Sequence, residues 1–299
     1  MTSAMSHHDA LDFGSIDLGP ISAPEHEGAN VSVRELTRLL HIDYPDEAWL
    51  ARTAFALRRV HDGEALVHSG DKFHSLYIVR SGCFKTVYTD FSGSEQVLGF
   101  PMCGDLMGAD GIDGGHYKST AVSLDTSEVV IVPLAGMTRL TNECPSLEAL
   151  LYRVLSRELV RVQNMTWTLG TLGAEGRVAA FLLNLSERLG ALGYSRRSFN
   201  LRMTRQEIGS YLGLKLETVS RALSALNNTR IIHVHQRTID IIDPDALRAV
   251  VDPAGGAAPG IEAQPAAGPV RNGIQDDGRP GKSRATLPAD VPWRQLAVA

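Results

Sequence analysis

The chain has 299 residues, 43% hydrophobic and 21% charged, which is typical of a soluble globular protein with room for two domains. It has no run of about 18 apolar residues and no basic segment leading into an apolar one, so the sequence predicts neither a transmembrane helix nor a secretory signal. Cys83, Cys103 and Cys144 are widely spaced, which argues against a disulfide framework or a zinc ribbon and favours a reducing cytoplasm.

The charge is distributed unevenly along the chain. Residues 1–144 contain 10 Lys and Arg against 20 Asp and Glu, whereas residues 174–250 contain 11 against 7. An acidic first half followed by a basic second half indicates that the second half meets a polyanion.

The first predicted domain is rich in β-strands. Residues 1–40 read as an N-terminal segment that is mostly flexible, and residues 41–144 as a sensor domain. Within it, short strands such as "SLYIVRS", "CFKTVYTD" and "SEVVIVP" alternate with turn signals such as Ser69-Gly70-Asp71. This spacing is typical of a sandwich or barrel, with a jelly roll as one candidate.

After Pro145 the pattern changes to that of a helix, over residues 145–172. Its apolar residues recur in steps of four and three, while Arg153, Arg157 and Arg161 stay off the seam. A helix packed on its own domain and a dimer seam both fit. The residues predicted for a dimer seam are Leu151, Leu155, Leu159, Val162 and Leu169.

Residues 173–250 predict three helices followed by a β-hairpin. Thr204 and Glu207 have the spacing of a capping box, Gly213 interrupts the helical pattern, and Gln236-Arg237 stands near the hairpin turn. Residues 251–299 are dominated by Pro, Gly and Ala, a composition that predicts a disordered tail.

The segment "LETVSRALSAL", residues 216–226, gives the clearest functional signal. As a helix it places Glu217, Ser220, Arg221 and Ser224 on one face and apolar residues on the other. Two helices joined by a short Gly-containing turn form a helix-turn-helix, whose second helix enters the DNA major groove. There an Arg reads guanine and a Glu accepts from cytosine. A solvated i,i+4 ion pair between Glu217 and Arg221 is the alternative.

The hairpin after this helix would act as a wing along the DNA backbone. Arg230 and Arg237 are its candidate phosphate contacts. The full set of predicted DNA-binding residues is Thr204, Arg205, Lys215, Glu217, Ser220, Arg221, Ser224 and Arg237.

From about residue 54 to 247 the chain resembles the CRP/FNR superfamily of transcription regulators. The resemblance is greatest to the fumarate–nitrate (FNR) branch, in "SLYIVRSG", "EQVLGF", "GDLMGADGI", "RVAAFLLNLSERL" and "MTRQEIGSYLGLKLETVSRAL". It implies an α+β fold: a β-jelly-roll sensor domain like those that bind cyclic nucleotides, a long dimerisation helix, and a C-terminal winged helix-turn-helix. It also implies a homodimer on a palindromic, double-stranded DNA site.

The resemblance further implies what this regulator reads and contacts. Glu217, Ser220 and Arg221 stand where the branch reads half-sites like TTGAT. The turn at Ser92-Gly93 matches a loop that the family uses to contact RNA polymerase.

The FNR branch holds a [4Fe–4S] cluster on four cysteines, and this chain departs from that pattern. The corresponding places hold Gly28, Val31 and Thr37, with the fourth near Val130. Because iron in such clusters is held by thiolates, the sequence argues against this cluster and against any metal site of that type.

Other effectors of the superfamily stay open as alternatives. Gly104-Asp105 and Lys118-Ser119 stand near the places of a cyclic-nucleotide phosphate cassette, but Asp is shorter than Glu and Lys lacks the bidentate fork of Arg. No spacing singles out a haem ligand or a thiol switch. The candidate haem ligands are His41, His61, His68, His74 and His116.

The sequence therefore predicts a cytoplasmic transcription regulator without enzymatic activity and without a membrane partner. The first alternative is a small-molecule-binding module, which a lack of DNA affinity would favour. A cupin-like enzyme is the second, but residues 55–135 contain no His-x-His followed by a Glu and a His.

Overall fold

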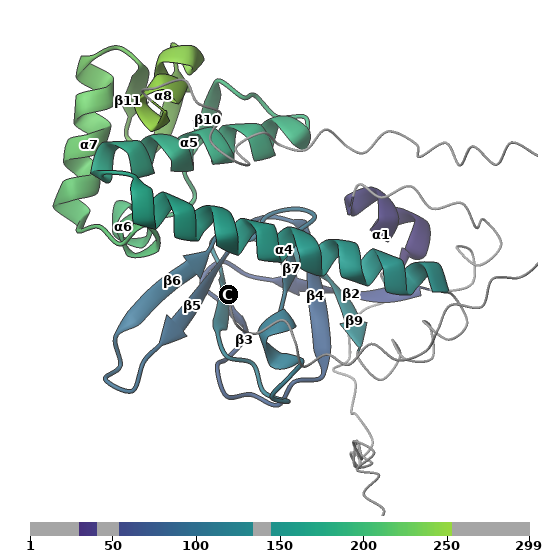
Figure 1. The fold of residues 1–299 in the computed structure, drawn as a ribbon. Coiled ribbons are helices and arrows are strands. Elements are labelled where there is room, and N and C mark those ends of the chain that lie inside the picture. The colour runs from purple at the N-terminus through teal and green to yellow at the C-terminus, as the bar shows by residue number, and fades with distance from the viewer. Residues whose placement is uncertain (1–29, 41–53, 134–144, 253–299) are drawn as a thin grey trace, which may run out of the picture. The chain divides into compact units, whose positions relative to one another are not determined.

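The computed structural model describes residues 30–40, 54–133 and 145–252. They form a β-rich N-terminal domain, a long helix and a mostly helical C-terminal domain, which confirms the predicted α+β class (Figure 1). No helix in these three ranges is long and apolar enough to cross a membrane. The predicted tail and residues 1–29 lie outside the described residues.

Two antiparallel sheets make up the N-terminal domain. One has the strand order β1-β2-β9-β4-β7 and the other β3-β8-β5-β6. The strands are β1 (Asn30–Ser32), β2 (Ala54–Val60), β3 (Ala65–Val67), β4 (Ser75–Ser81), β5 (Phe84–Thr89), β6 (Glu95–Gly99), β7 (Leu106–Met107), β8 (Thr120–Ser123) and β9 (Ser127–Pro133). A 3-10 turn, η1 (Ala109–Gly111), follows β7. Strand β6 is an edge strand of the second sheet.

The core of this domain is filled by large side chains. Phe84 and Tyr117 are almost fully buried, and Phe73 meets Tyr117 edge to face with ring centroids 5.3 Å apart. The Tyr117 hydroxyl donates to the carbonyl of Ser75 at 2.7 Å, so the ring's polar end is satisfied inside the apolar core.

The end of the N-terminal segment is folded, so the prediction of a mostly flexible segment is wrong for residues 30–40. Strand β1 pairs with β2, placing Val31 opposite Phe55, and helix α1 (Val33–Leu39) starts where the Ser32 side chain accepts from Glu35 N. Val31, Leu36 and Leu40 are buried against the sheets. Their apolar spacing is too short to stand out from the polar residues before it.

The long helix α4 spans Pro145–Thr171, close to the predicted 145–172. At 1.5 Å per residue it is about 40 Å long. Its Val154 is buried in the core of the β domain, and Leu151 and Leu155 pack against the same core.

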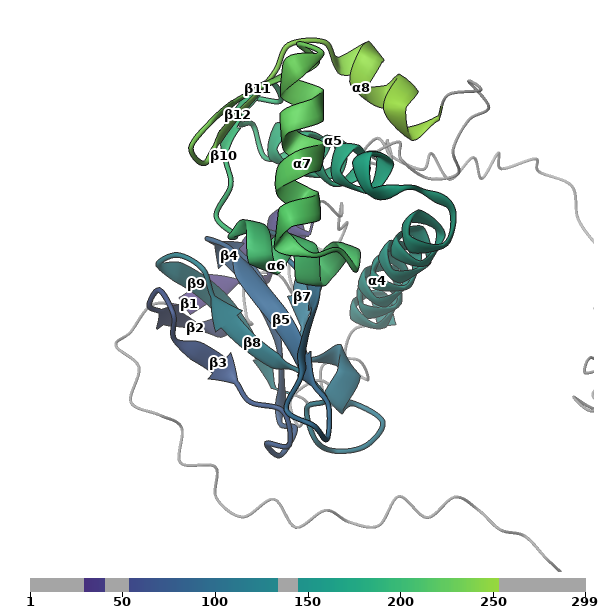
Figure 2. The same ribbon diagram turned by 90° about the vertical axis from the view of Figure 1, so that its left-hand side faces the viewer.

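The C-terminal domain combines four helices with a small sheet. The elements are α5 (Ala174–Ala191), β10 (Ser198–Asn200), α6 (Arg205–Leu212), α7 (Leu216–Asn228), β11 (Ile232–His235), β12 (Thr238–Ile241) and α8 (Pro244–Val251). The sheet order is β10-β12-β11. Figure 2 shows α7 running steeply across α6, the arrangement of a helix-turn-helix.

Local chemistry sets the angle between α6 and α7. The predicted capping box is present: the Thr204 side chain accepts from Glu207 N, and the Glu207 carboxylate accepts from Thr204 N. Gly213 ends α6 with φ 63°, a left-handed conformation that favours glycine. Gly209 allows the turn to close, because a Cβ there would lie 2.6 Å from the carbonyl oxygen of Leu214.

Candidate nucleic-acid interface

Helix α7 has the two faces predicted from its sequence. Val219, Ala222, Leu223 and Leu226 are buried in the C-terminal core. On the opposite side Glu217, Arg221 and Ser224 are exposed and Ser220 is half-buried. The polar side chains therefore lie on the side of α7 that faces away from the C-terminal core.

The structure brings residues of α6 to the same face. Arg205, in the first turn of α6, donates from Nη1 to Ser220 Oγ at 3.3 Å. Ser224 Oγ donates to the Ser220 carbonyl at 2.9 Å. Thr204 and Lys215 are the exposed N-cap residues of α6 and α7. Helix N-termini of this kind favour phosphate oxygens.

The hairpin of β11 and β12 forms the predicted wing. Its turn places Gln236 at φ 54° and leaves Arg237 exposed. A pocket between the wing, α6 and α7 is lined by residues that include Thr204, Arg205 and Arg237. Seven of the eight predicted DNA-binding residues thus lie on α6 and α7 or at their N-caps. The eighth, Arg237, lines the same pocket as Arg205.

Sequence reasoning missed Arg202, which precedes α6. Its guanidinium is more than half exposed and forms an ion pair with Asp125 of the β8–β9 turn. This ion pair joins the β domain to the segment that leads into α6. No sequence pattern distinguished it from Arg196 or Arg197.

The predicted dimer residues fall into two groups. Leu151 and Leu155 pack against the chain's own β domain, and Leu169 is half-buried near Gly213. Leu159 and Val162 are exposed, at 60% and 62%, as is Val160 at 44%. The sequence could not separate these groups, because both recur with the same heptad-like spacing.

The positions that hold cluster ligands in the FNR branch carry no thiol in this chain. Val31 and Val130 are fully buried in the hydrophobic core, and Thr37 is buried too. Gly28 lies outside the described residues. Aliphatic side chains and a hydroxyl do not provide the thiolates that bind iron in such a cluster, so these residues do not fit a [4Fe–4S] cluster.

The places that correspond to a cyclic-nucleotide cassette are already engaged within the chain. Both carboxylate oxygens of Asp105 accept from the chain's own donors, including Arg161 and Arg188. Ser119 Oγ donates to Asp110 Oδ2 at 2.6 Å, so this hydroxyl is paired with a carboxylate of its own chain. This arrangement argues against a nucleotide at these residues.

The remaining effector candidates show no converging geometry. His61, His68, His74 and His116 are exposed, and His41 lies outside the described residues. Within the described ranges there is no group of three or more His, Cys, Asp or Glu suited to a metal ion. Burial raises the pKa of the Cys83 thiol to about 12 and also raises that of Cys103, which disfavours thiolate chemistry at both.

The β domain contacts the first helix of the helix-turn-helix directly. Lys85 Nζ of β5 lies 2.7 Å from Glu207 Oε1. The backbone N–H of Val97, on the edge strand β6, donates to Ser210 Oγ at 2.9 Å, and Gln96 donates to the Ser210 carbonyl. Helix α6 therefore covers an open sheet edge whose donors would otherwise need water.

Comparisons with known proteins agree with this geometry. The family model of the Crp-like helix-turn-helix domain matches residues 176–250, and that of the cyclic nucleotide-binding domain matches residues 57–144. The transcriptional regulatory protein btr of Bordetella pertussis is 42% identical over 193 residues, which cover 64% of this chain and 80% of that protein.

Two further relatives extend the comparison. The fumarate and nitrate reduction regulatory protein of Salmonella typhimurium is 40% identical over 191 residues, covering 64% of this chain and 76% of that protein. Among solved structures, FixK2 from Bradyrhizobium japonicum is 25% identical with a TM-score of 0.61, covering 69% of this chain and 100% of that one.

Proposed function

Since the chain belongs to the CRP/FNR superfamily of DNA-binding transcription regulators, we propose that it binds as a homodimer to a palindromic site with TTGAT-type half-sites and contacts RNA polymerase. The matched relatives are transcription regulators and not enzymes.

The exposed face of α7 is the observation that carries the half-site. Arg221 can donate two hydrogen bonds to guanine, Glu217 can accept from cytosine N4, and Ser220 can contact a neighbouring base. Arg205 reaches Ser220 from α6, which restricts where the hydroxyl lies when the helix enters the groove. One guanine and its paired cytosine are present in each TTGAT half-site.

The exposed apolar side chains of α4 support the homodimer. Leu159, Val160 and Val162 lie on the part of α4 that does not face the chain's own β domain. Large apolar side chains exposed within one turn of a long helix favour a surface that pairs with another helix. A second copy of the chain, related by a two-fold axis, would match a palindromic site.

The hairpin between β5 and β6 supports the polymerase contact. Asp90 Oδ1 accepts from Ser92 N, Ser92 Oγ and Ser94 N, which stabilises the turn. The Phe91 side chain at its tip is fully exposed. An exposed aromatic ring at the tip of a loop resembles the aromatic anchor residues of protein interfaces. This is the loop that contains Ser92-Gly93.

The test is a binding titration at fixed salt with fluorescent duplexes. One carries two TTGAT half-sites with centres about one helical turn apart, and the other carries the same sites with the G·C pairs swapped. We expect Arg221→Ala to cost about 1–3 kcal/mol on the first duplex and to abolish discrimination between the two. Unchanged discrimination would remove Arg221 as the guanine reader. No preference in the unsubstituted protein would overturn the proposed half-site.

The proposal includes no iron–sulfur cluster. Absorbance spectra with iron and sulfide analysis of anaerobically purified protein test this directly. Stoichiometric iron and sulfide would contradict it, and a Soret band would point to haem as the effector. The regulator would act in the cytoplasm, where its DNA lies.

A further inference from the structure

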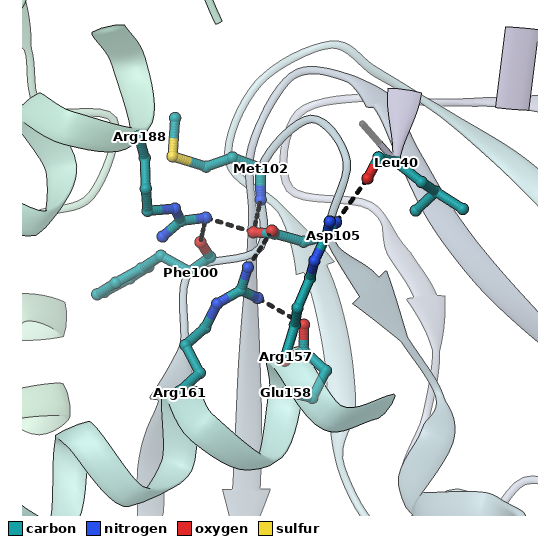
Figure 3. Close-up of polar contacts among 8 residues, drawn as sticks. All are labelled: Leu40, Phe100, Met102, Asp105, Arg157, Glu158, Arg161 and Arg188. Atoms are coloured by element: carbon teal, nitrogen blue, oxygen red, sulfur yellow. Dashed lines mark hydrogen bonds and ion pairs between the residues drawn. The ribbon is translucent and has the colours of Figure 1, made fainter. Parts of the chain in front are cut away.

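Asp105 links three parts of the chain through one carboxylate. It lies between β6 and β7, and its side chain is only 7% exposed. Oδ1 lies 2.5 Å from Arg161 Nη2 on α4, and Oδ2 accepts from Arg188 Nη2 on α5 (Figure 3). The backbone N–H of Met102 donates to Oδ2 at 2.8 Å, which holds the carboxylate in its own loop.

The two arginines have further partners that set their direction. Arg161 also reaches Glu158 Oε1 at 2.6 Å with Nη1, and Arg188 donates to the Phe100 carbonyl at 3.1 Å. The cluster in Figure 3 is therefore a network and not a single pair. Because Asp105 is its buried centre, removing this carboxylate leaves Arg161 and Arg188 with less compensation of their charges.

The network sets how α5 lies against α4. Arg161 stands on the helix that carries the proposed dimer surface, and Arg188 on the helix that opens the DNA-binding domain. Arg177 of α5 adds a second link, since it donates to the carbonyls of Leu169 at the end of α4 and Leu212 at the end of α6. In a dimer, the angle between α4 and α5 in each protomer decides the distance and direction between the two α7 helices.

We propose that Asp105 is a positioning residue for DNA binding. By holding Arg161 and Arg188 together, it fixes the DNA-binding domain on α4 so that both recognition helices reach successive half-sites. This inference rests on the proposed homodimer and half-site. It assigns to Asp105 a role inside the chain, where the family resemblance would assign contact with a nucleotide.

The test compares binding to a palindrome with binding to a single half-site. Asp105→Asn removes the charge at nearly constant volume. We expect its affinity for the palindrome to fall about 10- to 100-fold, the range of typical coupling between sites, while its affinity for a duplex with one half-site stays unchanged. Damage to the fold itself would lower both affinities together.

Two further variants sharpen this result. Arg188→Gln should give the same loss, and the double variant should lose little more than either single one, because both remove the same link. Asp245→Asn is the matched control: Asp245 also pairs with an arginine, Arg248, but inside α8. It should bind both duplexes as the unsubstituted protein does.

Each outcome has one meaning. A normal ratio of palindrome to half-site affinity in folded, dimeric Asp105→Asn would overturn the inference, as would equal losses on both duplexes. If Asp105→Asn does not fold, a normal ratio in Arg188→Gln would overturn it in the same way. Failure of the unsubstituted protein to prefer the palindrome over a scrambled duplex would instead overturn the proposed function.

Discussion

Lys85 and Glu207 are 122 residues apart and form an ion pair between the β domain and the helix-turn-helix, with Nζ 2.7 Å from Oε1. Glu207 is at the same time the third residue (N3) of α6 and completes its capping box with Thr204. One carboxylate therefore both begins a helix and docks it on another domain. This double role makes it sensitive to protonation.

The effect of pH on Glu207 can be predicted in sign. Burial would raise the pKa of this carboxyl, but the Lys85 ammonium and the donors of Thr204 hold it below its ordinary 4.5. A group with a lowered folded pKa stabilises the fold above its unfolded pKa, and that contribution is lost as the pH falls through the folded value. We expect Glu207→Gln to lower the free energy of unfolding by about 1 kcal/mol at pH 7, and by less at an acidic pH below the lowered pKa of Glu207.

Urea unfolding at both pH values measures this difference. Lys85→Met is the matched control, because it removes the ion pair and leaves the capping box in place. An equal penalty for Glu207→Gln at both pH values would contradict the assignment.

Substitutions of Arg237 and Arg221 should have different effects on DNA binding. Arg237 lies at the wing turn, so we expect Arg237→Ala to weaken binding to all duplexes alike and to reduce the salt slope by about one unit. Arg221→Ala should instead change which base is preferred. Titrations at several salt concentrations on matched and swapped duplexes separate the two effects. A change of preference on removal of Arg237 would place that residue at a base edge.

The dimer surface can be tested with a charge on α4. Leu159 is 60% exposed, so Leu159→Glu should leave the stability of the protomer within about 0.5 kcal/mol of its original value. Light scattering should then report a monomer, since the charge would be buried in the helix pair. Tyr194→Glu is the control, at a residue that is 68% exposed outside α4. A dimer that persists in Leu159→Glu would exclude this surface.

Cys83 should be chemically inert in the folded protein. With its pKa raised to about 12 by burial, only about one thiol in ten thousand is ionised at pH 8. We expect iodoacetamide to label it slowly in buffer and rapidly in urea, as followed by peptide mass spectrometry. Fast labelling of the native protein would reopen a thiol switch at this cysteine.

Gly209 should not tolerate a side chain. A Cβ would lie 2.6 Å from the backbone oxygen of Leu214, so Gly209→Ala has to open the turn between α6 and α7. We expect a loss of about 1–3 kcal/mol in unfolding free energy. Gly170→Ala, in α4 with nothing within 4 Å of the added methyl group, should be neutral or stabilising by comparison. Equal stability of the two variants would contradict this account.

The sequence by itself determined the features that depend on neighbours along the chain. The two faces of α7, the capping box of Thr204 and Glu207, and the wing hairpin all follow from spacing within a few residues. So does the absence of thiolates at Val31 and Val130, which is a matter of residue identity. Most of the β domain also followed, because alternating strands and Gly-containing turns leave a local pattern.

Only the tertiary structure decided which distant groups meet. Residues 30–40 joined the core because strand β1 found the edge of β2, which no local pattern specifies. The two predicted roles of α4, packing on its own domain and forming a dimer seam, fit different residues of the helix. Leu155 packs inward and Leu159 faces outward, although both fit the same repeat. Asp105 acquired its partners across 56 and 83 residues of chain. Contacts between residues so far apart in the sequence depend on how the packed elements place buried charges. The free energy of such contacts is set by the whole fold.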